Sequence, residues 1–136
     1  MDRNAVANCD RALKNAMTFA LRSAGMSIDQ IGHIHAHGLS TQKSDVDEAQ
    51  AIIEVFGRRC HPIPVTAAKS YFGNLGAGSG VVELICSLLA IQHGRLFPVL
   101  NYEQPDPECP LSVVDGSELY TARECLACDH RGCKRR

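Results

Sequence analysis

A run of closely spaced glycines, flanked by a lysine and a glutamate, constrains the fold of this chain more than any other stretch. Four glycines lie within residues 73–80, between a short apolar segment at residues 64–66 and an apolar helical pattern. Glycines at this density are typical of places where the backbone passes close to other backbone or to a ligand. Lys69 precedes the glycines and Glu83 follows them. We therefore expect a strand, a tight turn and a helix built around a functional site.

Three segments have the periodicity of helices. Apolar residues recur at spacings of three and four over residues 4–24 and again over residues 46–56, where Ser44 and Asp47 have the form of a capping box. Residues 74–93 are apolar nearly all round, which is typical of a helix in the middle of a fold. Each pattern is followed by a glycine suited to end a helix: Gly25, Gly57 and Gly94.

Short segments between and after these helices predict strands. They cover residues 31–37, 63–66, 111–114 and 119–127. Residues 98–110 are punctuated by proline and are expected to be extended without regular structure. This order predicts an α/β fold with strands threaded between helices. Because no linker divides the chain, we expect residues 1–136 to form one domain, with residues 115–136 as a divergent tail that frays.

Composition excludes several classes of protein. The formal net charge is −1 and no basic run alternates with aromatic residues, so nucleic acid is not an expected partner. No apolar segment approaches the roughly 20 residues that a membrane span requires. The first residues lack the apolar block of a signal peptide, so we expect a cytoplasmic protein. The seven cysteines are an odd number, which argues against a disulfide framework.

Three histidines alternate along the first predicted strand. His33, His35 and His37 would share one face of it, where they would form either a metal site or simply the strand's polar face. His37 also lies at the strand's end, directly before Gly38, where α/β proteins usually place functional side chains.

The lysine and the glutamate beside the glycines fit no nucleotide-binding motif. Lys69 precedes the glycines, whereas a P-loop lysine follows them, and the spacing of the glycines does not match GxGxxG. Glu83 lies in an apolar helix, and a buried carboxylate needs a partner, for which Lys69 is the candidate. The pair has two interpretations: a structural ion pair or part of a site. Asp45 and Glu48 open the second helix, where the helix dipole favours acids in any case.

Three segments in unbroken order resemble the β-ketoacyl-acyl carrier protein synthases. They are AHGLSTQKSDVDEAQAIIEVFG at residues 36–57, TAAKSYFGNLGAGSGVVE at residues 66–83 and LFPVLNYEQPDPECPL at residues 96–111. They resemble the family's AHGTxTxxxDxxEAxAIxxVFG, SxKSxxGHxxGAxGxxE and iPPTLNxxxPDPxCPL. The resemblance covers roughly residues 5 to 115. It implies the C-terminal half of a thiolase-type fold, with a mixed sheet layered with helices and one buried apolar helix.

The resemblance also implies an activity. Such enzymes load an acyl chain onto a cysteine, decarboxylate a malonyl thioester on carrier protein, and let the resulting carbanion attack the acyl group. By position, His37 resembles the first of the family's two oxyanion-binding histidines, and Asn74 stands in the place of the second. The remaining site residues implied by position are Lys69 as a catalytic brace, Glu83, Asp45 and Glu48 in support, and Thr41, Gly73 and Gly76 at the substrate.

The same resemblance implies partners. These are an acyl carrier protein bearing malonyl or acyl thioesters, and either a second copy of the chain or a chain carrying the missing N-terminal half. Neither a membrane nor a nucleic acid is expected. No catalytic metal or cofactor is implied, apart from a structural monovalent cation near Asp45 and Glu83, where His35 replaces a common Asn.

The chain departs from the family pattern at several places. Asn74 replaces a histidine and cannot carry a proton at neutral pH, although its amide still donates hydrogen bonds. Leu39 replaces a threonine beside His37, and the tail HRGCKRR lacks the phenylalanine of the family's closing FGGxN motif. The family's nucleophilic cysteine lies in the absent N-terminal half. Cys60 follows two arginines but lacks the strand–elbow–helix context of that nucleophile.

Two other functions remain open at this stage. The first is a non-catalytic partner similar to chain-length-determining subunits, which requires only the fold and an interface. The second is a small zinc module, because the tail contains four potential ligands, although without the usual spacer between two pairs. These ligands are Cys125, Cys128, His130 and Cys133.

Overall fold

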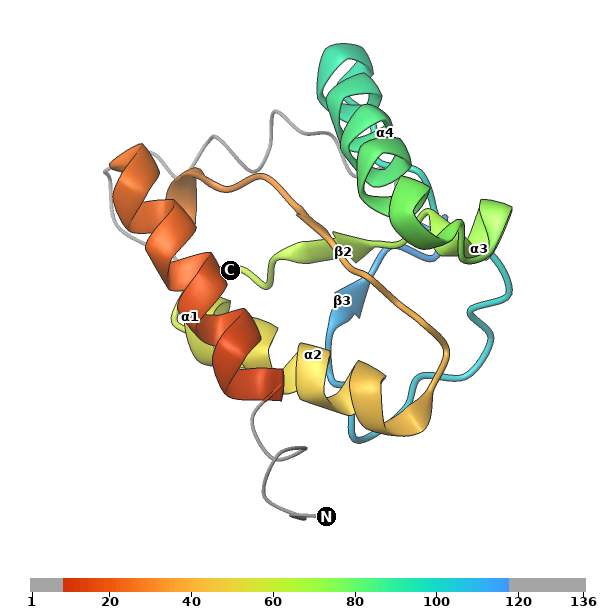
Figure 1. Ribbon diagram of the computed structural model, residues 1–136, viewed down its shortest axis with the longest axis horizontal. Coiled ribbons are helices and arrows are strands. Elements are labelled where there is room, and N and C mark those ends of the chain that lie inside the picture. The colour runs from red at the N-terminus through yellow and green to blue at the C-terminus, as the bar shows by residue number, and fades with distance from the viewer. Residues whose placement is uncertain (1–8, 118–136) are drawn as a thin grey trace.

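A three-stranded sheet lies at the centre of the molecule. The computed structural model describes residues 9–117, and its strands are β1 (Ile34–His35), β2 (Pro64–Thr66) and β3 (Ser112–Val113). They lie side by side in the order β1-β2-β3, and both pairings are parallel, with Ile34 opposite Val65 and Val65 opposite Val113 (Figure 1). The α/β class is confirmed. In the part described, the sheet is parallel rather than mixed, since each strand reaches the next by a crossover containing helix or extended chain.

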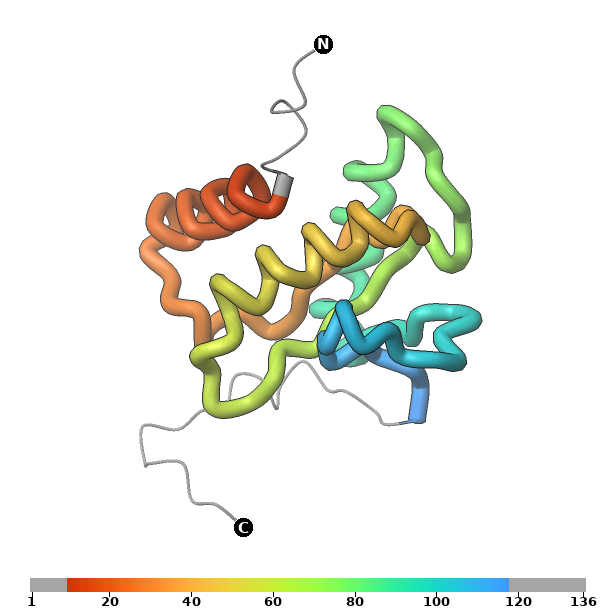
Figure 2. The backbone as a smooth tube through the Cα atoms, turned by 90° about the horizontal axis from the view of Figure 1, so that it is seen from below, coloured from red at the N-terminus to blue at the C-terminus, as the bar shows by residue number. Residues whose placement is uncertain are grey.

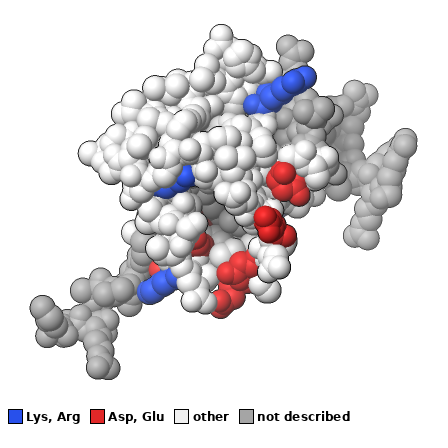
Figure 3. All heavy atoms as spheres, turned by 90° about the vertical axis from the view of Figure 1, so that its right-hand side faces the viewer, with Lys and Arg blue, Asp and Glu red and all other residues white. Residues whose placement is uncertain are grey.

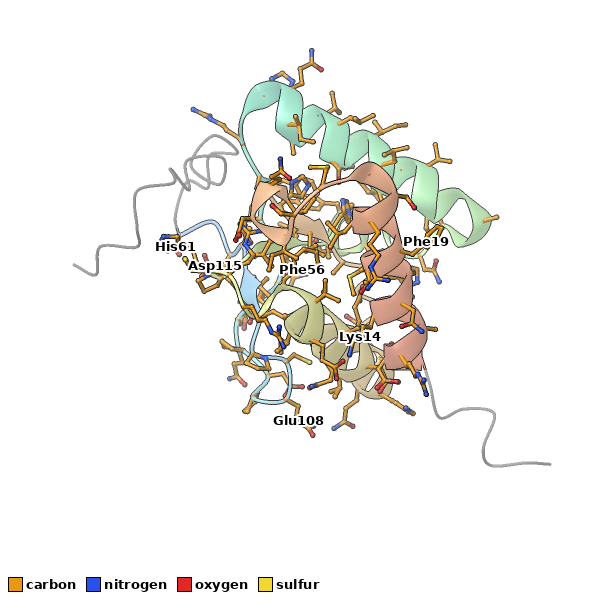
Figure 4. All side chains as sticks on the ribbon, turned by 90° about the vertical axis from the view of Figure 1, so that its left-hand side faces the viewer. Lys14, Phe19, Phe56, His61, Glu108 and Asp115 are labelled. Atoms are coloured by element: carbon orange, nitrogen blue, oxygen red, sulfur yellow. The ribbon has the colours of Figure 1, made fainter. Side chains whose placement is uncertain are left out.

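Two helices cover one side of the sheet and form the core with it. They are α1 (Cys9–Ala24) and α2 (Gln42–Phe56), which pack against each other (Figure 1). Ile52 and Phe56 of α2 are buried against Ile63, and Met17 and Leu21 of α1 pack onto this cluster. Phe56 lies in the interior of the molecule (Figure 4). The predicted helix at residues 4–24 is therefore confirmed over Cys9–Ala24, and residues 4–8 lie outside the described range.

The predicted start of α2 is wrong by three residues, because the capping box placed the N-cap at Ser44. The N-cap is Thr41, whose carbonyl accepts the first helical hydrogen bond from Asp45 N at 3.0 Å. Ser44 is already inside the first turn, where its Oγ donates back to the Thr41 carbonyl at 3.2 Å. A serine engaged in this way cannot cap, so Ser44 and Asp47 form no capping box. The helix ends at Gly57, as predicted.

The glycine-rich stretch folds into two short helical turns before the long helix. These are α3 (Lys69–Phe72) and the 3₁₀ helix η3 (Gly76–Gly78), and the long helix α4 then covers Ser79–His93. Elsewhere, a separate 3₁₀ turn, η2 (Ile28–Gln30), links α1 to β1. The long helix was expected from residue 74. It starts later because Gly73 and Gly76 have φ values of +70° and +57°, a left-handed conformation that interrupts a right-handed helix. Gly94 ends α4 with φ +64°, as predicted.

Helix α4 lies across the molecule beyond the sheet (Figure 1). Its large apolar side chains are exposed. The prediction that it is buried is wrong for this chain. Its inward stripe contains the less exposed residues Ser79, Val82, Glu83, Cys86, Ser87 and Ala90. Its outward residues are large and apolar, and roughly half or more of each is exposed: Val81, Leu84, Ile85, Leu88, Leu89 and Ile91. The polar residues Ser79, Glu83 and Ser87 of this helix thus face the protein, whereas its largest apolar side chains face away from it.

The same stretch corrects the expectation that the chain has no segment long enough to span a membrane. By length and composition alone, the 18 residues Gly76–His93, with a mean hydropathy of 1.2, could cross one, and 11% of this stretch is buried. A helix that packs against another part of a protein has the same character.

The chain returns from α4 to the sheet through an extended segment. Residues 95–111 contain no helix, as the prolines predicted, and they turn back across the sheet end in Figure 2. The segment is fixed by hydrogen bonds from Thr66 Oγ1 to the Phe97 carbonyl (2.8 Å) and from Val99 N to the Val114 carbonyl (2.7 Å). Strand β3 confirms the prediction for residues 111–114. The predicted strand at 119–127 and the cysteine–histidine tail lie outside the described residues.

Candidate active site

Two carboxylates of α2 hold the loop that follows β1. Glu48 accepts hydrogen bonds from the backbone N–H groups of His37 (2.7 Å) and Gly38 (3.0 Å), and Asp45 accepts one from Leu39 (3.2 Å). Gly38 has φ +52°, and a Cβ there would lie 3.2 Å from the Cβ of Ala67. Glu48 and Asp45 therefore fix the backbone that carries His37.

The imidazole of His37 contacts the ammonium group of Lys69. Lys69 Nζ lies 2.9 Å from His37 Nδ1, and the His37 side chain is 53% exposed. An ammonium group can only donate hydrogen bonds, so Nδ1 must be the acceptor. The proton of the neutral ring is consequently on Nε2, where it remains available to donate to a ligand.

Lys69 is held in turn by Glu83, and this predicted pairing is confirmed. The Lys69 ammonium donates to Glu83 Oε1, and the two side chains are only 6% and 18% exposed. Glu83 Oε1 also lies 3.8 Å from His37 Nδ1. The ion pair therefore joins α3 to α4 and fixes the cation that orients the imidazole.

Asn74 lies in the turn between α3 and η3. Its Oδ1 accepts hydrogen bonds from Gly76 N (3.1 Å) and Ser79 Oγ (3.2 Å). Because its oxygen is engaged, the amide nitrogen is the end that can donate, and no partner for it lies among residues 9–117. Asn74 and Lys69 line one cavity, whereas His37 is not among the lining residues.

The cavity has a volume of about 730 Å³. It is lined by the loop after β1, the start of α2, residues of β2 and β3, α3, and the extended segment at residues 99–109. The hollow opens on the face shown in Figure 3, where several acidic side chains gather beside it. A cavity of this size falls within the range of small-molecule binding sites.

The residues predicted at the substrate are only partly placed there. Gly73 lines the cavity, as does Leu39, which replaces the family's threonine. Thr41 and Gly76 are not among the lining residues. Thr41 is instead occupied as the N-cap of α2, with its hydroxyl in contact with Ser44 Oγ, and Gly76 supports Asn74 through its N–H.

Tyr102 and Cys109 are among the polar residues of the cavity wall that the sequence reasoning missed. Burial, followed by the charge of Asp106, raises the pKa of the Cys109 thiol, and burial together with Cys109 raises the pKa of Tyr102. A thiol with a raised pKa is not activated as a nucleophile. Cys60, the other thiol considered, precedes β2 and is therefore at the opposite end of that strand from Lys69.

The three histidines of the predicted first strand, of which only His35 lies in β1, separate into two groups. His33 Nε2 and His35 Nδ1 both lie within hydrogen-bond distance of Ser87 Oγ, at 3.3 and 2.9 Å, whereas His37 contacts Lys69. Burial lowers the pKa of both His33 and His35. Over the described residues, no group of three or more His, Cys, Asp or Glu side chains is arranged to hold a metal ion, so the three-histidine metal site is wrong.

Comparison with known proteins identifies relatives for most of the chain. Residues 2–103 match the family described as β-ketoacyl synthase, C-terminal domain. The 3-oxoacyl-[acyl-carrier-protein] synthase 2 of Synechocystis sp. is 38% identical over 106 residues, 78% of this chain and 26% of the relative. The ketoacyl synthase alpha subunit of the tetracenomycin polyketide synthase of Streptomyces glaucescens is 39% identical over 104 residues, 76% of this chain and 24% of the relative.

Solved structures agree with these sequence matches. The ishigamide ketosynthase/chain length factor superimposes with a TM-score of 0.74 at 34% identity, over 78% of this chain and 26% of that one. A type II polyketide ketosynthase, solved in complex with its acyl-carrier protein, gives a TM-score of 0.72 at 32% identity, over 76% and 25% of the two chains. The chain thus spans about a quarter of the length of its relatives, less than the half that was expected.

Proposed function

This chain belongs to the β-ketoacyl synthase family through its C-terminal domain, and from that premise we propose that it forms part of a carbon–carbon bond-forming acyltransferase. The reaction is the decarboxylative condensation of a malonyl thioester with an acyl thioester. The chain spans about a quarter of its relatives, so the complete activity requires the remaining polypeptide, including the cysteine that carries the acyl group.

The observation that best supports this function is the 2.9 Å contact of Lys69 Nζ with His37 Nδ1, from which the His37 tautomer is inferred. Decarboxylation breaks the bond between the malonyl carboxylate and the α-carbon, CO₂ leaves, and the electron pair forms an enolate on the thioester oxygen. His37 Nε2–H is the donor suited to that oxygen, because Lys69 occupies Nδ1. A donor of this kind is worth about 2.7–4 kcal/mol in an oxyanion hole. The carbanion then attacks the acyl carbonyl and expels the cysteine thiolate.

Asn74 is proposed as the second donor. Its oxygen is engaged by Gly76 and Ser79, and its amide nitrogen lies at the end of the side chain that can donate. A carboxamide stabilises an oxyanion without transferring a proton, which matches the requirement of this step.

The test requires the missing part of the protein. Mixing this chain with the N-terminal portion of a β-ketoacyl synthase should restore CO₂ release from malonyl-acyl carrier protein. His37→Ala should lower the rate at least about 100-fold, as expected for loss of an oxyanion donor. His61→Ala is the matched control, because His61 is exposed and precedes β2. Unchanged turnover in His37→Ala would show that the assignment is wrong.

The partners of the proposed enzyme follow from the relatives. One related ketosynthase is described in complex with its acyl-carrier protein, and we propose an acyl carrier protein as the substrate carrier here. A second copy of the chain, or a chain carrying the N-terminal part, is the proposed protein partner. Cell fractionation tests the cytoplasmic location, which stays a prediction.

No resident cofactor enters this mechanism. The structural cation near Asp45 and Glu83 also stays a prediction, and both carboxylates already have partners in the protein, Leu39 N and Lys69 Nζ. Sodium or potassium dependence of the unfolding temperature would test it.

A non-catalytic partner subunit is the second candidate function. The observation that favours it is the carboxamide at position 74, where the family has a histidine. In that case a complex with an active synthase should form, and Asn74→Ala should leave its turnover unchanged. The zinc module involves residues outside the described range, and metal analysis of the purified chain tests it directly.

A further inference from the structure

The ring of His35 is fixed by contacts on several sides. Its Nδ1 lies 2.9 Å from Ser87 Oγ of α4, and its Nε2 lies 3.0 Å from the backbone nitrogen of Ala68. The ring of Phe97 packs edge-on against it, with centroids 5.6 Å apart. His35 thus links β1, the start of α3, α4 and the extended segment.

The hydrogen bonds through His35 can run in only one direction. The Ala68 N–H can only donate, so Nε2 of His35 must accept and the ring proton must be on Nδ1. That proton is donated to Ser87 Oγ, and the Ser87 hydroxyl is left to donate to His33 Nε2 at 3.3 Å. A backbone amide therefore sets the tautomer of His35 and the direction of the bonds to Ser87 and His33.

Ala68 is the point at which this arrangement reaches the proposed active site. It is the N-cap of α3, is only 2% exposed, and directly precedes Lys69. Since water cannot easily replace a partner there, loss of the bond from its N–H would leave a buried donor unsatisfied. We infer that His35 is a positioning residue: in its neutral Nδ1–H form it holds Ala68 and thereby aims the Lys69 ammonium at His37. The consequence for catalysis rests on the proposed function.

Protonation would reverse this role. A second proton would have to be on Nε2, where it would face the Ala68 N–H instead of accepting from it. The charged groups around His35 come from each neighbouring element: Glu83 of α4 favours protonation, whereas Lys69 of α3 and His33 of its own strand segment oppose it. Burial has the largest effect and favours the neutral ring.

Histidine tautomers can be read in the full chain by two-bond ¹H–¹⁵N correlation spectra of ¹⁵N-labelled imidazoles. In the wild-type chain, His35 should be the Nδ1–H form and His37 the Nε2–H form. His35→Leu should convert His37 from one tautomer to a mixture, because Lys69 is no longer aimed at Nδ1. His35→Gln should restore the single form, because its side-chain oxygen can accept from Ala68 N–H.

The matched control is His33→Leu, which removes the far end of the same hydrogen-bond series and should leave His37 unchanged. If the His37 tautomer is unaffected by His35→Leu, or if His35 itself is the Nε2–H form, the inference is wrong. If His35→Leu fails to fold, a wild-type pH titration decides. The Ala68 amide and the His37 ring must then shift together as His35 protonates, and independent shifts overturn the proposal.

The enzyme assay separates this inference from the proposed function. In the complemented synthase, His35→Leu should be roughly 100-fold slower, as expected when a catalytic group is displaced by about 1 Å, and His35→Gln should recover most of the rate. If the tautomer shifts are observed but neither the wild type nor any variant shows turnover, the proposed function fails and the positioning role stands.

Discussion

Two half-buried imidazoles make the stability of this chain depend on pH. Burial lowers the pKa of His33 and of His35 below 6.5. Below pH 6.5 the unfolded chain therefore binds protons that the folded chain does not yet bind. The contribution of the two neutral histidines to the free energy of unfolding should be fully present above pH 6.5. It should be lost as the pH drops through the two lowered pKa values, with each histidine contributing at most about 1.4 kcal/mol per pH unit.

Urea unfolding at a series of pH values between 4.5 and 7.5, a range chosen around the ordinary imidazole value, measures this slope. The double variant His33→Leu/His35→Gln should flatten the acid side, whereas His61→Ala, which changes an exposed imidazole, should not. A slope that is the same in the double variant would assign the acid sensitivity to the carboxylates instead.

The proposed catalytic contribution of the Asn74 carboxamide can be separated from its role in the loop. Asn74→Ala removes the amide donor and should slow the complemented enzyme about 10²–10³-fold. It also removes the acceptor of Gly76 N, so Ser79→Ala is the appropriate comparison: it removes the other partner of Oδ1 and leaves the amide in place. Equal losses in the two variants would mean that Asn74 acts only on the loop structure.

At the level of residues, sequence reasoning found the ion pair of Lys69 and Glu83 because a carboxylate in an apolar helix needs a partner. It did not find the contact of His35 with Ser87. Nothing in the local spacing connects residues so far apart in the chain. The available signal was the position of Ser87 one helical turn after Glu83, on the same side of α4.

At the level of elements, the ion pair is the main polar link between α3 and α4. Both side chains are largely buried, so removing one partner leaves an uncompensated charge. Glu83→Leu or Lys69→Met should each lower the free energy of unfolding by about 3–5 kcal/mol, whereas the double variant should recover much of that loss. Denaturant unfolding of the four proteins of this cycle measures it. Additive losses would show that the two groups do not stabilise each other.

The periodicity predicted the helices well but located their ends less well. A hydrophobic stripe depends on many residues, whereas the start of a helix depends on one or two hydrogen bonds. Thr41 rather than Ser44 caps α2 because the Thr41 carbonyl begins the helical ladder. The glycines before α4 were interpreted as a turn leading directly into the helix, but two left-handed glycines divide that stretch into α3 and η3.

At the scale of the whole molecule, the two sides of α4 have the opposite polarity to those of an ordinary surface helix. Its inward residues include Ser79, Glu83 and Ser87, which make hydrogen bonds to Asn74, Lys69 and the two histidines, while its large apolar side chains point away. The apolar composition predicted a helix covered on all sides. The chain itself covers only one side, and it spans about a quarter of its relatives, so the outward side is where further protein should pack.

The final prediction concerns that outward side, defined by Val81, Leu84, Ile85, Leu88, Leu89 and Ile91. An apolar surface of this extent is unusual on a monomer, so the isolated chain should self-associate. Leu84→Gln/Leu88→Gln changes two neighbouring exposed side chains, 60% and 56% accessible, without touching Glu83 or Ser87. Analytical ultracentrifugation should show a shift toward monomer in this double variant.

Phe19→Gln is the control for that experiment, because Phe19 is 72% exposed but lies on α1, and it should leave the association unchanged. Addition of the N-terminal portion of a synthase should compete with self-association, since both would bury the same leucines. A wild-type chain that sediments as a monomer at micromolar concentration would contradict the prediction. Flotation of the wild-type chain with lipid vesicles, lost in the double variant, would instead assign the apolar side of α4 to a membrane.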